Sequence, residues 1–256
     1  MSYFQILGSV LFVYMSFWFL VSLVKKRNDV ADTAWGLGFV LLTWVSYFLS
    51  GNADTRILIV NTLVTIWGAR LAWHIHKRNK GKTEDYRYLA WRNEWGKWFY
   101  LRSYLQVYLL QGFFLFLIVS PVLTINKNSI SILGVGDVIG FIIWIIGFTF
   151  ESVGDSQLKK FISKPENKGK LMREGLWQYT RHPNYFGEVM QWWGIWVVSL
   201  SVANGFYTIV GPLMITFLIL KVSGVPMLEK KMEENPDFID YKKQTSVFIP
   251  WFKAHK

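Results

Sequence analysis

The side chains most capable of chemistry lie around a proline in the segment RHPNY, residues 181–185. Proline is favoured in the first turn of a helix, so Pro183 predicts that an apolar helix begins here. Arg181, His182 and Asn184 would then surround the N-terminus of that helix. Unpaired backbone N–H groups and the helix dipole make such a position a binding site for anions such as phosphate or pyrophosphate. The alternative is a basic belt at the membrane surface that ends in a helix cap.

Three carboxylates lie in or beside apolar runs, where an unpaired charge is costly. Glu188 falls one turn after Asn184, on the same helical face. Glu151 and Asp155 are four residues apart and also share a face, at the expected inner end of a span. Acids at a helix C-terminus oppose the dipole and therefore need a partner. Two partners stay open: the hydroxyl or amide groups of a ligand, and nearby basic residues (Lys159, Arg173 and Arg181).

A second polar group lies in the first third of the chain. Asp32 and Asp29 precede an apolar run, where an aspartate could be an N-cap or a functional carboxylate. Arg70 and His74 are four residues apart and share one helical face. An imidazole suits proton donation near neutral pH, so His74 is the candidate acid. The alternatives are a hydrogen-bonded structural histidine and an arginine that pairs with a buried carboxylate.

Apolar runs must position these residues, because 52% of the chain is hydrophobic and 18% is aromatic. A membrane-spanning helix needs roughly 20 mostly apolar residues. The composition predicts an all-α membrane helix bundle of about seven spans, in one domain covering residues 1–256. The expected spans are 3–24, 33–50, 57–75, 103–123, 133–152, 185–203 and 206–225.

The charge distribution predicts the orientation of the bundle. The net charge is +11, and 25 of the 28 lysines and arginines fall in alternate joins and the tail. Cytoplasmic loops of membrane proteins carry such an excess, which predicts an outside N-terminus and a cytoplasmic C-terminus. The flanking pattern favours membrane lipids over nucleic acid as the negative partner. Cysteine is absent, which excludes disulfides and thiolate metal sites; no metal site is predicted.

Several motifs resemble the steroid 5-alpha-reductase family and, more distantly, sterol reductases and isoprenylcysteine methyltransferases. The resemblance covers about residues 134–252. It includes Glu151 to Asp155, Arg173 with GLWQY at 175–179, RHPNY followed by Gly187-Glu188, and a tail with Tyr241 and Phe248-Ile249-Pro250. Asp-x-x-Trp-Gly at 32–36 and the loop at 78–88 resemble the bacterial branch. That likeness implies a bacterial inner membrane.

The resemblance implies an NADPH-dependent reductase of a carbon–carbon double bond conjugated to a carbonyl, in a lipophilic substrate. The cofactor would enter from the cytoplasm between the last three spans, and its phosphates would meet Lys159, Arg173 and Arg181. Its polar groups would be held by five further side chains: Glu151, Asp155, Tyr179, Asn184 and Tyr241. Glu188 would lie near the nicotinamide amide. His182 belongs to the same cofactor-binding set.

The substrate's expected surroundings differ from those of characterised steroid reductases. Their Gln-Glu pair in the second helix is replaced by AWGL at 34–37, and their carbonyl-contacting tyrosine aligns with His74. His74, with Asp32, would polarise or protonate the carbonyl oxygen. The substrate would enter from the lipid into a cavity lined by Trp35, Phe39 and Trp44.

Two other functions stay open. The related methyltransferases share an Arg-His-Pro-x-Tyr motif, so an enzyme that uses S-adenosylmethionine is one alternative. Glu151, Asp155 and the Gly-Glu after the motif favour the reductase, and the basic loops suit a 2′-phosphate better than a sulfonium. A non-catalytic lipid-binding or scaffolding membrane protein is the other alternative. No obligate protein partner is expected.

Overall fold

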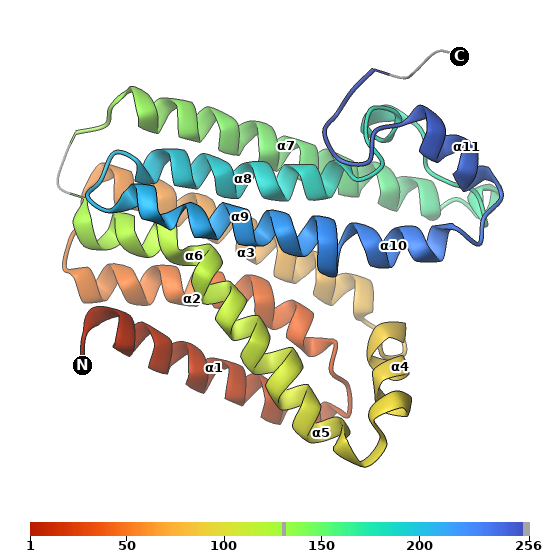
Figure 1. Cartoon of the computed structure of the whole chain (residues 1–256), viewed down its shortest axis with the longest axis horizontal. Coiled ribbons are helices and arrows are strands. Elements are labelled where there is room, and N and C mark those ends of the chain that lie inside the picture. The colour runs from red at the N-terminus through yellow and green to blue at the C-terminus, as the bar shows by residue number, and fades with distance from the viewer. Residues whose placement is uncertain (130–131, 253–256) are drawn as a thin grey trace. The chain divides into compact units, whose positions relative to one another are not determined.

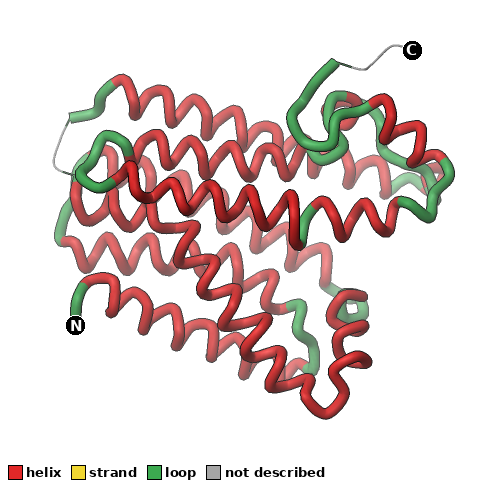
Figure 2. Tube along the Cα trace, viewed as in Figure 1, coloured by secondary structure: helices red, strands yellow, loops and turns green. Residues whose placement is uncertain are grey.

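The structure is a computed structural model that describes residues 1–129 and 132–252, and the described residues form helices and loops (Figure 2). The α-helices are α1 (Tyr3–Lys25), α2 (Val30–Ser50), α3 (Thr55–Asn79), α4 (Tyr86–Trp95), α5 (Phe99–Arg102), α6 (Leu110–Asn128), α7 (Val135–Ile162), α8 (Pro183–Ser199), α9 (Val210–Phe217), α10 (Val225–Met232) and α11 (Asp237–Gln244). Two π-helical stretches, Ser103–Leu109 and Leu218–Val222, continue α5 into α6 and extend α9. Short 3₁₀ turns are Gly96–Trp98, Pro165–Asn167, Gly175–Gln178 and Gly205–Ile209.

Among the residues that the structure describes, six helical segments are long and apolar enough to cross a membrane. They are Tyr3–Lys25, Val30–Ser50, Thr55–Asn79, Tyr86–Asn128, Val135–Ile162 and Gly205–Met232. The prediction of an all-α membrane bundle is confirmed, and the protein is an integral membrane protein. The sixth expected span, 185–203, corresponds to α8, which has 17 residues. At about 1.5 Å per residue α8 would reach about 25 Å, short of a hydrocarbon core of about 30 Å. The count of seven and the orientation stay predictions.

Several large aliphatic side chains on α7 are exposed, whereas three of its glycines are buried. Ile142 and Ile145 are 53% and 56% exposed, whereas Gly140 and Gly147 are buried. A helix in water would hide its isoleucines. Lipid solvates large apolar side chains, and small residues let helices approach closely, so this distribution is typical of a membrane helix.

The chain forms two compact units. Unit 1 comprises Met1–Leu133 and Ser199–Val210, and unit 2 comprises Gly134–Val198 and the chain from Gly211 onward. In unit 1, α1, α2 and α3 follow one another and the α5–α6 segment crosses them obliquely (Figure 1). Helices α2 and α3 touch where a Cβ on Gly36 would lie 2.6 Å from the carbonyl oxygen of Gly68. The glycine of the Asp-x-x-Trp-Gly element therefore permits close helix packing. Unit 2 corresponds to the region of family resemblance; the single-domain reading stays a prediction.

In unit 2, two rows of glycines join α7 to α8. A Cβ on Gly140 would lie 2.6 Å from the carbonyl oxygen of Gly194, and one on Gly147 would lie 2.6 Å from that of Gly187. Both distances are shorter than a van der Waals contact, so no side chain fits between the two backbones at these points. The glycines are seven residues apart on each helix, which repeats one face every two turns. This glycine seam (Gly140, Gly147, Gly187 and Gly194) sets the register in which the polar residues of α7 and α8 face each other.

Replacing Gly187 with Ala is expected to destabilise unit 2. The added methyl would collide with the backbone nitrogen of Glu151 and the carbonyl oxygen of Gly147, which cannot move alone. Overpacking typically costs about 1–3 kcal/mol, which corresponds to a loss of roughly 2–12 °C in Tm. Thermal unfolding of the detergent-purified protein measures it. Gly8→Ala is the control, since a Cβ there meets nothing within 4 Å; an equal Tm for both variants contradicts the close seam.

Two parts of unit 2 differ from the sequence-based expectation. The fifth span was predicted to end at 152, but α7 continues to Ile162, so Asp155 and Lys159 lie on the helix instead of in a loop. Glu151 and Asp155 are therefore not at a helix C-terminus, and the argument from the helix dipole does not apply to them. The tail, for which no helix was predicted, forms α10 and α11.

Candidate functional site

Two carboxylate–amide pairs connect α7 and α8 in unit 2. Gln191 donates from Nε2 to Glu151 Oε2 over 2.5 Å, and Asn184 donates from Nδ2 to Asp155 Oδ1 over 3.1 Å. Glu151 and Gln191 are buried, with 3% and 1% of their surfaces exposed. Carboxylates are acceptors with two oxygens each, so the two pairs place several acceptor oxygens along the α7–α8 contact. Gln191 was not singled out from the sequence, although it follows Asn184 by seven residues on the same face.

Behind the start of α8 lies a buried ionic cluster. Arg181 donates from Nε to Glu229 Oε1 over 2.7 Å, and His182 Nε2 lies 3.1 Å from the same oxygen. The Arg181 side chain is 6% exposed and that of His182 is 1% exposed. The His182 ring also stacks on Tyr185, with centroids 5.6 Å apart. Two of the three residues predicted to bind an anion, Arg181 and His182, thus contact Glu229 of α10, a residue that no motif in the sequence marked.

Arg181 and its neighbours also hold the C-terminal tail. Arg181 Nη1 donates to the carbonyl oxygens of Thr245 (2.5 Å) and Lys242 (3.3 Å), and its backbone N–H donates to Ser246 over 2.8 Å. Tyr241 donates from its hydroxyl to the carbonyl of Trp177 over 2.5 Å. Burial raises the pKa of Tyr241, so the hydroxyl keeps its proton. The tail is therefore folded against the segment that precedes α8.

The remaining predicted cofactor residues of unit 2 are more accessible. Lys159 is exposed, and its side chain makes no hydrogen bond or ion pair within the described part of the chain. Arg173 donates to the carbonyl of Asp237 and lies over the Tyr241 ring at 5.4 Å. Tyr179 is 38% exposed, and Glu188 is half-buried on α8. These positions leave Lys159 the most available cation of the predicted set.

In unit 1, Asp32 belongs to an ion-pair network. Its carboxylate accepts from the Tyr88 hydroxyl at 2.7 Å and from Arg87 Nη2 at 2.9 Å, and Arg78 lies at 4.0 Å. The neighbouring Asp85 belongs to the same network through Arg87. Burial alone would raise the pKa of Asp85, but hydrogen bonds from the Arg87 side chain and backbone outweigh burial and hold that pKa below its ordinary value. The predicted catalytic carboxylate thus anchors the loop at 78–88 to α2.

The same network joins the turn before α2 to α4. Arg27 binds Asp29 with Nε and Nη2, each at 2.6 Å. Glu84 accepts from the Asn28 backbone at 2.5 Å and pairs with Arg92 at 3.1 Å. Tyr88, Glu84 and Arg92 were not proposed as site residues, although all lie in or next to the motif noted at 78–88.

His74 and the predicted substrate residues also lie in unit 1. Arg70 and His74 are half-buried on α3, one turn apart. Phe39 is fully buried between Trp35 and Trp67, with ring centroids 5.2 and 5.1 Å away.

Trp44, the third of these residues, donates from Nε1 to Thr65 Oγ1 over 2.9 Å. The three aromatic residues therefore pack at the α2–α3 pair, and the expected cavity stays a prediction.

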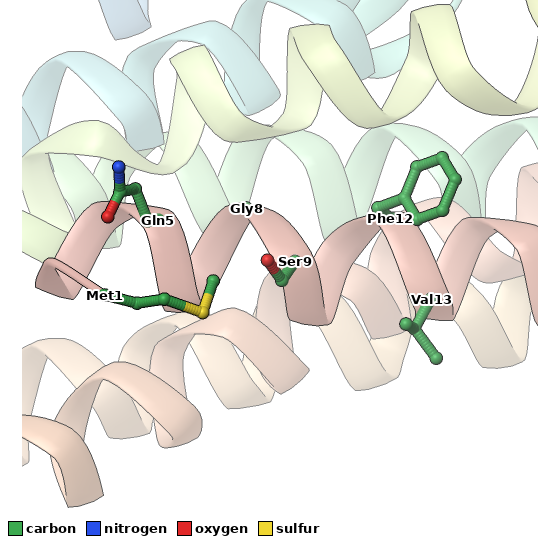
Figure 3. Close-up of a pocket in the computed structure, with 6 residues that line it drawn as sticks. All are labelled: Met1, Gln5, Gly8, Ser9, Phe12 and Val13. Atoms are coloured by element: carbon green, nitrogen blue, oxygen red, sulfur yellow. The ribbon is translucent and has the colours of Figure 1, made fainter.

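A shallow groove on α1 carries none of this chemistry (Figure 3). It is lined by Met1, Gln5, Gly8, Ser9, Phe12 and Val13. Phe12 and Val13 are 54% and 65% exposed, and no lining residue has an ionisable side chain. Exposed apolar residues on a membrane helix are suited to contact with lipid chains.

The comparison with protein families identifies one family. The family described as "Protein of unknown function (DUF1295)" matches residues 18–245, most of both units. The chain belongs to the DUF1295 family. The resemblance to the steroid 5-alpha-reductase family is confirmed at this level, since distant relatives named as a steroid 5-alpha-reductase and as 3-oxo-5-alpha-steroid 4-dehydrogenases also match. The bacterial branch stays a prediction.

Individual relatives of this DUF1295 member cover different shares of it. An uncharacterised protein of Schizosaccharomyces pombe is 27% identical over 96% of this chain and 77% of its own length. The 3-oxo-5-alpha-steroid 4-dehydrogenase 1 of Homo sapiens is 34% identical over 39% of this chain and 38% of its own length. A probable O-methyltransferase of Ustilaginoidea virens is 39% identical over 26% of this chain and 22% of its own length. The last two matches each span less than half of the relative. No solved structure matches the chain.

Proposed function

We propose that the protein is an NADPH-dependent reductase of a carbon–carbon double bond conjugated to a carbonyl in a lipophilic substrate. The observation that carries the proposal is the pair of carboxylate–amide contacts between α7 and α8, Glu151 with Gln191 and Asp155 with Asn184. The named steroid dehydrogenases among the relatives support the reaction class.

The chemistry of unit 2 fits a nicotinamide nucleotide. Gln191 Oε1 is buried and has no hydrogen-bond partner among the described residues, so it can accept a hydrogen bond from a ligand. With the carboxylates of Glu151 and Asp155 it forms a set of acceptors. Ribose hydroxyls and a carboxamide N–H₂ are donors that such a set can bind. The exposed Lys159 and the half-exposed Arg173 supply cations suited to phosphate.

Each residue of unit 2 then has a role. Glu151 and Asp155 would accept from hydroxyl or amide groups, Asn184 would orient Asp155, and Glu188 would lie near the carboxamide. Lys159 and Arg173 would bind phosphate oxygens, while Tyr179 and Tyr241 would border them. Arg181 and His182 would act through Glu229, keeping the start of α8 and the tail in place. The bound cofactor would supply a hydride; the protein supplies position and electrostatics.

The residues of unit 1 would serve the substrate. His74 would donate a hydrogen bond or proton to the carbonyl oxygen as negative charge develops there. Asp32 would support this role indirectly by holding the Tyr88 and Arg87 side chains. Trp35, Phe39 and Trp44 would contact the lipophilic body of the substrate.

Cofactor titration tests the reaction class. The detergent-purified protein is titrated with NADPH, NADH and S-adenosylmethionine, using energy transfer from its 14 tryptophans to reduced nicotinamide and thermal shift for the methyl donor. NADPH is expected to bind most tightly. Asp155→Asn should weaken it by roughly 10- to 100-fold, since a charged hydrogen bond contributes about 1.5–3 kcal/mol. Asp240→Asn, which changes an exposed acid of α11, is the control and should bind NADPH normally.

A methyltransferase is the second candidate, because the Ustilaginoidea virens relative is named as a probable O-methyltransferase. Binding of S-adenosylmethionine without NADPH would establish that class and reject the reductase. If neither cofactor binds, the protein is better described as a lipid-binding membrane protein without enzyme activity.

A further inference from the structure

Thr43 on α2, Asn61 on α3 and Asn126 on α6 are completely buried polar side chains of unit 1, each 0% exposed. Four of their atoms lack a hydrogen-bond partner among the residues that the structure describes. These atoms are Thr43 Oγ1, Asn61 Nδ2, Asn61 Oδ1 and Asn126 Oδ1. Leaving a donor or acceptor unpaired is especially costly within a membrane, so these four atoms require an explanation.

The three side chains belong to one cluster. Asn126 donates from Nδ2 to the Thr43 carbonyl over 3.0 Å and to Ser46 Oγ over 2.5 Å. Helices α2 and α3 are joined by a short turn and cross where Gly36 meets Gly68. Thr43 follows Gly36 by seven residues and Asn61 precedes Gly68 by seven. In an antiparallel pair, these equal steps of two turns bring Thr43 level with Asn61. Thr43 is therefore level with Asn61 and accepts from Asn126 through its backbone carbonyl.

The character of the atoms indicates the ligand. Asn61 Nδ2 is a donor, Asn61 Oδ1 and Asn126 Oδ1 are acceptors, and the Thr43 hydroxyl can be either. No member of this set carries a charge, so it offers no compensation to a carboxylate or an ammonium group. A hydroxyl group both donates and accepts, and it is neutral.

We propose that Thr43, Asn61 and Asn126 form a buried binding site for one hydroxyl group. The hydroxyl can come from an internal water molecule or from the alcohol end of a lipophilic ligand. Internal waters typically bridge about three such groups. This site does not depend on the proposed reductase activity, because none of its residues is assigned to cofactor binding or catalysis.

The sign of a stability change tests the site. Thr43→Val preserves shape and removes only Oγ1. With a bound hydroxyl, the variant loses a hydrogen bond, and its Tm should fall by roughly 2–6 °C. Without one, removal of an unpaired polar atom should leave Tm unchanged or raise it, which would overturn the proposal. Thr62→Val is the matched control: Thr62 is exposed on α3 and bonds its own helix at the Leu58 carbonyl, 2.7 Å away.

A second variant and two additives identify the source of the hydroxyl. Measurements use an amine-oxide detergent, which has no hydroxyl group, with dodecan-1-ol or dodecane added to the wild type and to Asn61→Leu. Stabilisation of the wild type alone by dodecan-1-ol, beyond dodecane, supports a lipophilic alcohol. Equal effects of both additives, with a lowered Tm in Thr43→Val, support water. If Asn61→Leu does not fold, the sign for Thr43→Val alone decides.

Discussion

Replacing Glu229 with Gln is expected to lower the Tm of the purified protein by about 6–20 °C, because removing one partner of a buried ion pair typically costs about 3–5 kcal/mol. The Glu229 carboxylate contacts both Arg181 and His182 through one oxygen. The Arg181 guanidinium is 6% exposed, so water cannot replace the lost charge. A glutamine keeps the shape of the side chain and isolates the contribution of that charge. Thermal unfolding in detergent measures the change.

Glu233→Gln is the matched control for this experiment. Glu233 also pairs with a cation, Lys242 at 3.1 Å, but its side chain is 59% exposed. An exposed pair contributes about 0–1 kcal/mol, which predicts a Tm change below about 4 °C. Equal losses in the two variants would contradict the special role of the buried cluster.

The Glu229 variant should also loosen the tail. Arg181 holds the carbonyl oxygens of Lys242 and Thr245 as well as Glu229, so misplacing the guanidinium releases the segment after α11. Trypsin should then cleave after Lys242 or Lys243 faster than in the wild type, at a temperature where both proteins are folded. An unchanged cleavage rate would show that the tail is held independently of Glu229.

Replacing His74 with Ala is expected to reduce turnover by roughly 10²- to 10⁴-fold, the usual contribution of a general acid. The proposed acid acts on the substrate carbonyl and has no assigned role in cofactor binding, so NADPH affinity should stay unchanged. The assay follows NADPH oxidation with a panel of conjugated enones, including a 3-oxo-4-ene steroid. Lower turnover with unchanged NADPH affinity indicates a catalytic effect, whereas loss of both turnover and NADPH affinity indicates misfolding.

His76→Ala is the control for the catalytic prediction. His76 lies on the same helix two residues later, but it is exposed and stacks beside Trp73 at 6.4 Å. Surface substitutions usually change the free energy of unfolding by about 0.5 kcal/mol or less, so the variant should stay folded. Because His76 has no assigned catalytic role, turnover should stay within about twofold of the wild type. Normal turnover in His74→Ala would remove this residue from the mechanism.

The sequence predicted the membrane helices because their signal is local. The hydropathy of each residue indicates whether it favours lipid or water, without reference to distant partners. Accordingly, α1 and α2 begin and end within a few residues of the predicted bounds. The end of α7 was missed for the same reason. Its last turns are polar, so hydropathy marked the edge of the apolar run, while helical hydrogen bonding continues to Ile162.

Pairing between distant residues required the tertiary structure. The types and spacing of Glu151, Asp155 and Asn184 marked them as chemically important, but their amide partners depend on the α7–α8 register. Spacing alone also could not show that Arg181 contacts Glu229, which is 48 residues away. An arginine near a helix start has the same local sequence whether it faces a phosphate or a carboxylate.

The sequence by itself determined the helical membrane architecture, the family and the residues with chemical potential. Only the tertiary structure decided which of these residues pair, which are buried, and that Asp32 holds a loop through Arg87 and Tyr88. The physical reason is that apolar burial depends on each residue's own solvation, whereas a hydrogen bond or ion pair depends on where a distant partner lies.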